Sequence, residues 1–360
     1  MKPRIHGPAL EIELSERQAM VLRTLVAAYV GQAGPVGSKT LAQLMATRLS
    51  SATVRNALAQ LHDLGLIDKA HASAGRVPTA LGMRLFVDRL LDVSGLGAHQ
   101  QRMLDRALAG VDAAETPRQA SQLLSHHTRQ LGFVLPPRLD HLRLRSIHLV
   151  GLSAERVLAV LVTEAGSVIQ RHLAPSEAIS ARELEQIRSA LAERVAGRTL
   201  SDLRRLLEAE RAALEGEAGS LMRRVWDLGL GACGEGESLV EDLVIGTRLM
   251  LLDQPEFADP ERIRALFAAL ETNQRLLDLL QELGMADGEH VGVGLAISLG
   301  TELGEPSLRE CALLAVPYGA RNEEGALGML GVIGPQRMDY ARVIPLVQYC
   351  SELVTRKLLA

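Results

Sequence analysis

The sequence contains few of the side chains on which many protein chemistries depend. Only 2% of its 360 residues are aromatic, so the core has to be built mainly from aliphatic side chains. The three cysteines, Cys233, Cys311 and Cys350, lie far apart without a CxxC pair, which favours reduced, buried thiols. His126 and His127 are adjacent, but no cysteine or carboxylate stands at ligand spacing from them. We therefore expect no metal site.

Long hydrophobic runs are also missing. No uncharged apolar stretch reaches the length of about eighteen residues that indicates a membrane-spanning helix. Residues 1–18, MKPRIHGPALEIELSERQ, lack the apolar centre of a secretion signal. With 47% hydrophobic and 23% charged residues, the composition is that of ordinary globular domains, and the length allows two or three of them. We therefore expect a cytoplasmic protein with no membrane contact.

Motifs of catalysis and nucleotide binding are absent or incomplete. GPVGSKT (34–40) is close to a phosphate-binding loop, but Ser38 separates the glycine from Lys39, which that loop does not allow. Four glycines recur at every third position: Gly325, Gly328, Gly331 and Gly334. That spacing is not the one that binds dinucleotides, and it suits a turn and a strand of small residues. GxSxG and HExxH do not occur, so we expect neither an enzyme nor a bound cofactor.

Charge is distributed unevenly along the chain. Residues 1–92 contain 11 Lys and Arg against 7 Asp and Glu, a net charge of +4, and the remainder contains 28 against 36, a net charge of −8. An anionic partner would therefore meet the N-terminal part of the chain.

The N-terminal part has the pattern of a winged helix-turn-helix. The expected elements are helices over 15–31 and 39–46, a helix between Ser50 and Gly65, a strand over 66–69, a loop over 71–79 and a helix to about residue 92. Ser15 with Gln18 has the spacing of a capping box, and Ser38 and Ser50 are expected to cap the second and third helices. Three helices followed by a strand and a basic loop is the order of this DNA-binding fold.

The third helix, within LSSATVRNALAQLHDLGLI (49–67), has the face expected of a helix that reads DNA. A 3.6-residue period turns Val54, Leu58 and Leu61 toward the core. The opposite side then carries Ser51, Ala52, Arg55, Asn56 and Ala59, with Thr53 at its edge. Arginine can donate twice to guanine, asparagine can pair with adenine, and small side chains can contact the thymine methyl group, while Ser51 and the first amides suit a phosphate. An ordinary surface helix could show the same pattern, but the neighbouring elements favour DNA.

Two flanking segments are expected to contact DNA as well. The loop after the strand presents His71, Ser73 and Arg76, and Gly75 allows a close backbone approach, as in a wing. Ser38 and Lys39 start the second helix, where they can contact the phosphate backbone.

The remainder of the chain predicts an α+β domain interrupted by a mostly helical insertion. SGLGAHQ (94–100) is a linker by composition. Strand-forming runs occupy 146–152, 156–164, 167–173, 290–299, 310–319 and 326–335, and helical runs occupy 101–132, 180–230, 260–284 and 340–359. Because strands resume after the long helical stretch, we expect one sheet domain built from both sides of it.

Several motifs together resemble the family of bacterial heat-inducible transcription repressors called HrcA. They are LSERQ (14–18), PVGSKTL (35–41), LSSATVRNALAQLHDLGLI (49–67), SAGRVPT (73–79), QPEF (254–257) and GVIGPQRMDYARVIPLV (331–347). These motifs run from near one end of the chain to the other.

The resemblance implies an α+β multidomain protein. Its parts would be a winged helix-turn-helix domain over 1–94, a discontinuous GAF-like domain over 101–177 and 285–360, and an inserted, mostly helical dimerisation domain over 178–284. It also implies binding as a homodimer to CIRCE, an inverted-repeat operator in double-stranded DNA upstream of chaperone operons, with the GroEL chaperonin keeping the repressor active. Two helices in successive major grooves would match the two halves of such a repeat.

A small-molecule sensor built on the GAF-like domain is the alternative function. GAF-like domains often bind ligands, although a fold does not determine a function. Arg321, Asn322 and Tyr340 are the candidate polar groups for a pocket there.

Overall fold

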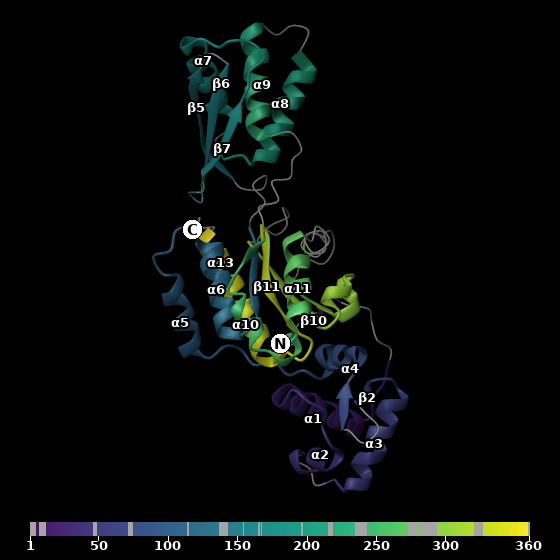
Figure 1. Cartoon of the computed structure of the whole chain (residues 1–360). Coiled ribbons are helices and arrows are strands. Elements are labelled where there is room, and N and C mark those ends of the chain that lie inside the picture. Colours follow the sequence, from purple (N-terminus) through teal and green to yellow (C-terminus); the bar gives the residue numbers. More distant parts are fainter. Residues whose placement is uncertain are drawn as a thin grey trace.

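Three units follow one another along the molecule (Figure 1). A computed structural model describes residues 5–6, 12–45, 49–70, 75–113, 115–136, 143–153, 155–164, 166, 168–195, 197–214, 219–234, 243–272, 280, 294–319 and 327–358. An N-terminal helical head lies at one end, a domain built on a six-stranded sheet lies in the middle, and a smaller α/β unit lies at the other end. None of the described helices is long and apolar enough to cross a membrane.

The head has the expected winged helix-turn-helix order. It contains α1 (Glu16–Gln32), α2 (Ser38–Leu44), α3 (Ser51–Asp63), β2 (Ile67–Lys69), β3 (Arg76–Pro78), α4 (Ala80–Leu85) and a π-helical turn (Phe86–Leu90). The aliphatic faces of α1 and α3 pack against each other, with Val21, Leu25, Leu58 and Leu61 fully or almost fully buried. The period of the sequence therefore identified the packed faces of both helices.

The helix caps follow the sequence at two of three serines. Ser15 and Gln18 form the expected capping box, and Ser50 Oγ accepts the Thr53 amide at 3.1 Å. Ser38 is different, because Gly37 is the N-cap of α2 and makes no side-chain bond, and Ser38 is the first helical residue. Val36, the residue before Gly37, is held in a backbone bridge with Arg76. Because of this bridge the chain is extended up to Gly37, and the helix begins after it.

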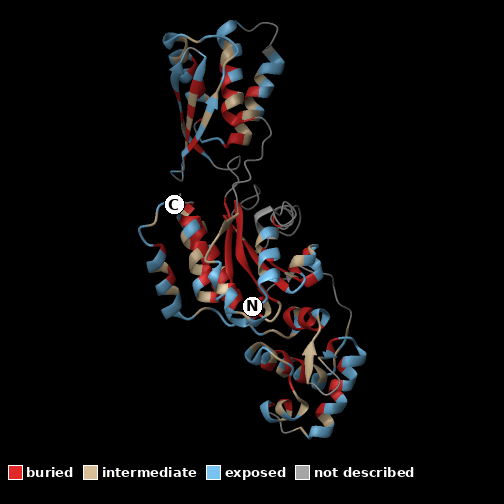
Figure 2. Cartoon of the chain, in the orientation of Figure 1, coloured by how far each residue is buried: buried red, intermediate tan, exposed pale blue. Residues whose placement is uncertain are grey.

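The middle unit, which we call the sheet domain, is organised around one mixed sheet. Its strands are β1 (Ile5–His6), β4 (Leu131–Leu135), β8 (Val244–Ile245), β9 (Leu295–Leu299), β10 (Cys311–Tyr318) and β11 (Gly328–Pro335). Their order is β1-β9-β10-β11-β4-β8, with β1 parallel to β9 and all other neighbours antiparallel. Every residue of β4 and β11 is buried, as expected of strands covered on both faces (Figure 2).

Helices cover both faces of this sheet. Alternate residues of β11 separate the two layers: Leu330 and Val332 join the core shared with the head, and Met329 and Ile333 join a second core on the opposite face. The first face is covered by α6 (Thr116–Thr128) and α13 (Tyr340–Leu358), with α5 (Ala98–Leu108) outside them. The second is covered by α10 (Leu249–Leu252), the 3-10 turn η3 (Pro255–Phe257), α11 (Pro260–Thr272) and the 3-10 turns η4 (Gly300–Leu303) and η5 (Pro306–Leu308).

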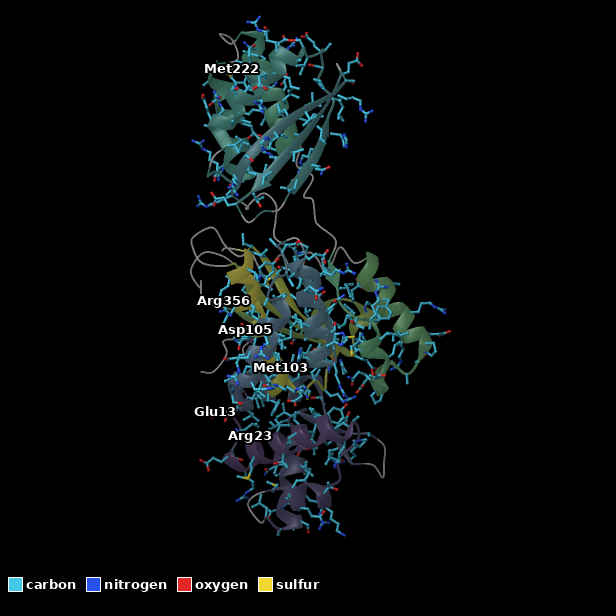
Figure 3. The ribbon with its side chains drawn as sticks, turned by 90° about the vertical axis from the view of Figure 1, so that its left-hand side faces the viewer. Glu13, Arg23, Met103, Asp105, Met222 and Arg356 are labelled. Carbon is cyan, nitrogen blue, oxygen red and sulfur yellow. The ribbon has the colours of Figure 1, made fainter. Side chains whose placement is uncertain are left out.

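Polar contacts as well as apolar contacts hold α5 on α13. The Tyr349 hydroxyl lies 3.0 Å from both carboxylate oxygens of Asp105, and Arg356 contacts the same carboxylate at 3.4 Å. Figure 3 shows Asp105 and Arg356 on neighbouring helices. This contact joins α5, the first helix after the linker, to α13.

The end unit, which we call the inserted unit, contains both strands and helices. It consists of β5 (Leu144–Ser153), β6 (Arg156–Thr163), β7 (Val168–Leu173), α7 (Ala181–Val195), α8 (Leu200–Leu214) and α9 (Ser220–Cys233). Its strands form a separate antiparallel sheet, and one face of that sheet packs on the helices around Trp226. The Trp226 indole donates to Glu210, which also pairs with Arg194 at 3.1 Å.

The structure groups these segments differently from the expected ranges. The strands over 144–173 were expected in the discontinuous GAF-like range, but they share their core with α7, α8 and α9. Residues 243–272 were expected in the insertion, but β8, α10 and α11 pack on the sheet domain. Periodicity identifies a helix or strand without identifying the core that it joins, which explains both differences. The expected alternation of an α+β domain with an insertion is nevertheless present.

Close packing of α6 on β4 depends on the absence of a side chain at Gly132. A Cβ atom there would lie 2.3 Å from Ser121 O and 2.8 Å from Ser125 N, both in the backbone of α6. We expect Gly132→Ala to lower the free energy of unfolding by about 1–3 kcal/mol, because the helix has to move off the sheet. Gly151→Ala is the matched control, since its Cβ would meet only the Leu184 side chain, at 3.3 Å. Denaturant titration of both variants checks the difference, and equal midpoints would contradict it.

Candidate nucleic-acid interface

The exposed side of α3 carries the residues expected to read bases. Ser51, Ala52, Arg55, Asn56 and Ala59 are all exposed, and Val54, Ala57, Leu58 and Leu61 are buried. The helix therefore has one packed side and one side of small, polar and basic residues. Both α2 and α3 lie in the part of the head away from the sheet domain (Figure 1).

The first turn of α3 combines a cap with a free set of amides. Ser50 Oγ bonds to the Thr53 amide at 3.1 Å and to the Thr53 hydroxyl at 2.8 Å, so Thr53 is engaged within the cap and only partly exposed. The Ser51 and Ala52 amides at the helix start lack intrahelical acceptors, which makes this end suited to a phosphate.

Arg55 and Asn56 are placed one turn into the helix. Arg55 Nε donates to Ser51 O at 3.2 Å, so its guanidinium group lies back along the helix toward the N-terminal turn. Both side chains are exposed, and recognition helices contact base edges mainly from this end. The geometry therefore leaves a bidentate donor and an amide accessible to a base edge.

The start of α2 provides a second exposed helix end. Lys39 is exposed and Ser38 is partly exposed in the first turn of α2. Because α2 packs against α3, the two N-terminal turns belong to one compact helix-turn-helix. A lysine at such an end can contact a phosphate but does not read sequence.

The base of the wing is built by three extended segments. β2 pairs with β3 through Ile67 and Pro78, Asp68 and Val77, and Lys69 and Arg76. Val36 then bridges Arg76 on the other side, with amide-to-carbonyl distances of 2.9 and 2.8 Å.

Gly75 has a structural reason to be glycine. A Cβ atom there would lie 2.5–2.7 Å from the backbone of Val36. The close backbone approach that the sequence indicated is therefore made to the protein itself, at the bridge. Arg76 is partly buried, and its Nε has no hydrogen-bond partner among the described residues. His71 and Ser73 lie outside the described residues.

Thr79 was assigned in the sequence only to the end of the loop, but it joins two parts of the head. Its hydroxyl donates to Gly65 O at 2.7 Å, at the end of α3, and accepts the Gly82 amide at 3.1 Å as the cap of α4. The spacing from Thr79 to Gly82 is that of an N-cap to the third residue of its helix, so the capping role of Thr79 could have been predicted from the sequence.

Of the three groups proposed for a small-molecule pocket, the structure describes only Tyr340. Tyr340 is almost fully buried, and its hydroxyl donates to Gln336 O at 2.8 Å, while burial raises the pKa of its phenol. Arg321 and Asn322 lie outside the described residues. Two cavities, of about 560 and 450 Å³, lie in the inserted unit, away from Tyr340.

Reactive thiols and metal clusters do not occur in the described part of the chain. All three cysteines are buried and free, and burial raises the pKa of Cys233 to about 11 and those of Cys311 and Cys350 to about 12. Thiols with such pKa values are protonated near neutral pH and react slowly. Within the described ranges, no group of three or more His, Cys, Asp or Glu side chains could hold a metal ion.

Comparison with known proteins gives matches along almost the whole chain. Residues 13–87 match the profile "Winged helix-turn-helix transcription repressor, HrcA DNA-binding", and residues 115–344 match "HrcA protein C terminal domain". The heat-inducible transcription repressor HrcA of Xanthomonas euvesicatoria pv. vesicatoria is 38% identical over 342 residues, covering 95% of both chains. That of Xylella fastidiosa is 36% identical over 341 residues, again covering 95% of both.

A solved structure has the same overall architecture. It is a crystal structure of a hypothetical protein, which superimposes with a TM-score of 0.58 over 96% of this chain and 97% of that one, at 23% sequence identity. At that identity the likeness concerns the fold alone. The two family profiles and the relatives cover the head, the sheet domain and the inserted unit together. The chain therefore belongs to the HrcA family of heat-inducible transcription repressors, which are DNA-binding negative regulators and not enzymes.

Proposed function

We propose that the chain represses chaperone operons by binding, as a homodimer, to the inverted-repeat operator CIRCE. The observation that carries this proposal is the exposed N-terminal half of α3, where Arg55 and Asn56 stand beside a capped turn with free amides. One head can read one half of an inverted repeat, and a twofold dimer presents a second head to the other half.

The contacts divide by chemistry. Arg55 and Asn56 read base edges, and the small side chain of Ala52 lies against a base or its methyl group. Ser51, Lys39, Ser38 and the first amides of α3 bind phosphates and set the register of the helix in the groove. Arg76 and the wing residues His71, Ser73 and Gly75 contact the neighbouring backbone or minor groove.

The outer face of the β5-β6-β7 sheet supports a dimer through the inserted unit. Cross-strand register places Val150 opposite Leu158 and Val162 opposite Val168, so aliphatic side chains adjoin on the face that does not pack on the helices. Val150, Leu152 and Val168 are 46%, 49% and 55% exposed. A second copy of the unit would cover this apolar face, since an inverted repeat requires two heads.

The same face supports a role for the GroEL chaperonin in keeping the repressor active. Before dimerisation the aliphatic side chains on this face are open to solvent, and such transient apolar surfaces drive aggregation and are what chaperones bind. Less available chaperonin during heat stress would then lower the population of active dimer and release the chaperone genes. The alternative, a small-molecule-sensing GAF-type regulator, has less support, because Tyr340 uses its hydroxyl internally and is buried.

The first test concerns base reading. We expect Arg55→Ala and Asn56→Ala each to weaken binding to the inverted repeat by about 1–3 kcal/mol and to narrow its advantage over a scrambled duplex. Arg23→Ala, which removes the same charge from the exposed side of α1, should leave that advantage unchanged. Titration of both duplexes at one salt concentration measures the difference, and an undiminished preference in both α3 variants would show that α3 does not read the bases.

The second test concerns the dimer. We expect the double variant Val150→Lys/Leu152→Lys to sediment as a monomer at concentrations where the wild type is a dimer, because two charges would enter an apolar interface. Met103→Lys, an equally exposed change on α5, should stay dimeric (Figure 3). Dimeric double variants would exclude this face as the interface.

The third test concerns the chaperonin. After heat treatment and return to low temperature, we expect GroEL with its co-chaperonin and ATP to restore more operator-binding protein than buffer alone, because it prevents association of the open sheet faces. Active protein is counted by titration with operator DNA. Equal recovery with and without chaperonin would contradict its role.

A further inference from the structure

Two arginines cross the boundary between the head and the sheet domain, one from each side. Arg337 follows β11 of the sheet domain and reaches α1 of the head, and Arg84 lies in α4 of the head and reaches β9 of the sheet domain. Each arginine belongs to one unit and contacts the backbone of the other, and the two contacts involve different helices and strands. Together they tie the head to its neighbour at two separate points.

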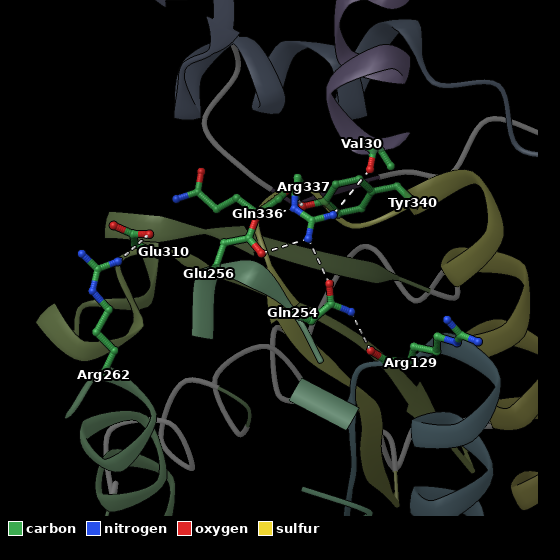
Figure 4. A network of polar contacts seen from close by, with 9 residues as sticks. All are labelled: Val30, Arg129, Gln254, Glu256, Arg262, Glu310, Gln336, Arg337 and Tyr340. Atoms are coloured by element: carbon green, nitrogen blue, oxygen red, sulfur yellow. Dashed lines mark hydrogen bonds and ion pairs between the residues drawn. The ribbon is translucent and has the colours of Figure 1, made fainter. Parts of the chain in front are cut away.

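Arg337 is held in a network that joins two motifs distant in sequence (Figure 4). Its side chain is only 11% exposed and makes a two-pronged contact with the Glu256 carboxylate, while Nη2 also donates to Gln254 Oε1 at 3.0 Å. Gln254 in turn donates to Arg129 O at the end of α6. These contacts within the sheet domain therefore fix the orientation of the guanidinium group that contacts the head.

The remaining donor of Arg337 meets the C-terminal end of α1. Nη1 lies 3.4 Å from Val30 O, one of the last carbonyls of the helix and therefore one without an intrahelical partner. The end of a helix carries partial negative charge, so a cation there is favourable. Tyr29 packs beside this contact, and burial together with the Glu256 charge raises the pKa of its phenol.

Arg84 makes the second connection from within the packed boundary. Its side chain is 3% exposed, with Nη1 donating to Ile297 O at 2.5 Å and lying 3.4 Å from Glu302. Nε donates to Asp88 at 3.0 Å within the head. Glu302 is itself fixed, since it accepts the Leu299 amide at 2.8 Å. A buried guanidinium with this many directional partners permits one orientation of α4 on the sheet.

We propose that Arg337 and Arg84 are positioning residues for operator binding, which hold the head at one angle to the sheet domain. Neither lies on the exposed side of α3, so they act through the placement of that helix. The inference rests on the proposed binding of a dimer to an inverted repeat. In that arrangement the angle of each head sets the distance between the two recognition helices.

The physical consequence is a preference for one half-site separation. Successive major grooves on one side of DNA repeat about every 34–36 Å, so two rigid heads fit one separation and miss others. Heads that can turn relative to the sheet domain would accept several separations. They would lose part of the affinity gained when both heads bind one DNA at once, which can reach roughly 10²–10⁴-fold.

The experiment uses the full chain with variants that replace one polar side chain by another. Arg337→Lys and Glu256→Gln weaken the first contact, and Glu302→Gln weakens the second without removing an acceptor for the Leu299 amide. Arg262→Gln is the matched control, since Arg262 pairs with Glu310 nearby at 3.4 Å and all its described partners lie in the sheet domain. Binding is measured to an isolated half-site and to inverted repeats whose half-sites are moved apart or together by a few base pairs.

We expect the wild type and Arg262→Gln to prefer one separation sharply. The three contact variants should bind that repeat about tenfold more weakly than the wild type. Their loss of affinity should be smaller for repeats with other separations, and their affinity for the isolated half-site should equal that of the wild type. Two results would overturn the positioning role: an unchanged separation profile, or an equal loss on half-site and full repeat, which would indicate general destabilisation. A wild type that binds the repeat no better than the half-site would instead overturn the proposed dimeric function, and this inference with it.

Discussion

The architecture depends on one constraint, that the helix proposed to read DNA must leave a whole side unpacked. Of the thirteen residues of α3, only Val54, Ala57, Leu58 and Leu61 are buried. A helix with so few buried residues is only marginally stable by itself, so its position depends on the elements that pack against its buried side. α1 supplies the apolar partner surface, and the Val36–Arg76 bridge fixes the turn before α2 to the wing. The core of the head then continues into the sheet domain instead of closing on itself.

A shared apolar core stabilises the contact between head and sheet domain but leaves its angle weakly specified. Aliphatic side chains contact one another with little dependence on direction, whereas a guanidinium with fixed acceptors has few acceptable orientations. Arg84 and Arg337 supply such direction at the boundary. Their burial costs desolvation energy, so we infer that these ion pairs serve to define one arrangement more than to add stability. A repressor that binds an inverted repeat, as proposed for this chain, would depend on such a single arrangement.

The sequence predicted local structure better than the pairing of distant segments. Capping at Ser15 and Ser50, the buried positions of α3 and the strands β9, β10 and β11 of the central sheet follow from short-range patterns, whereas β1, β4 and β8 were not predicted. The strands over 144–173 were also recognised, but their separate sheet was not, because alternation does not reveal which strand lies alongside. The Arg337–Glu256 contact joins residues 81 positions apart, and no periodicity links them. The exposed face of α3 was predictable because it requires only helix geometry.

The distance between the end proposed to read DNA and the proposed dimer face increases the importance of the boundary contacts. The inserted unit and the head lie at opposite ends of the molecule, with the sheet domain between them (Figure 1). If the dimer forms at the inserted unit, any rotation of the head about the sheet domain displaces α3 by an amount that grows with the length of the head. A contact of two or three hydrogen bonds at the base of the head then controls the separation of two helices far from it. In such a dimer the head would have to be attached rigidly at its boundary with the sheet domain. Arg84 and Arg337 lie at that boundary.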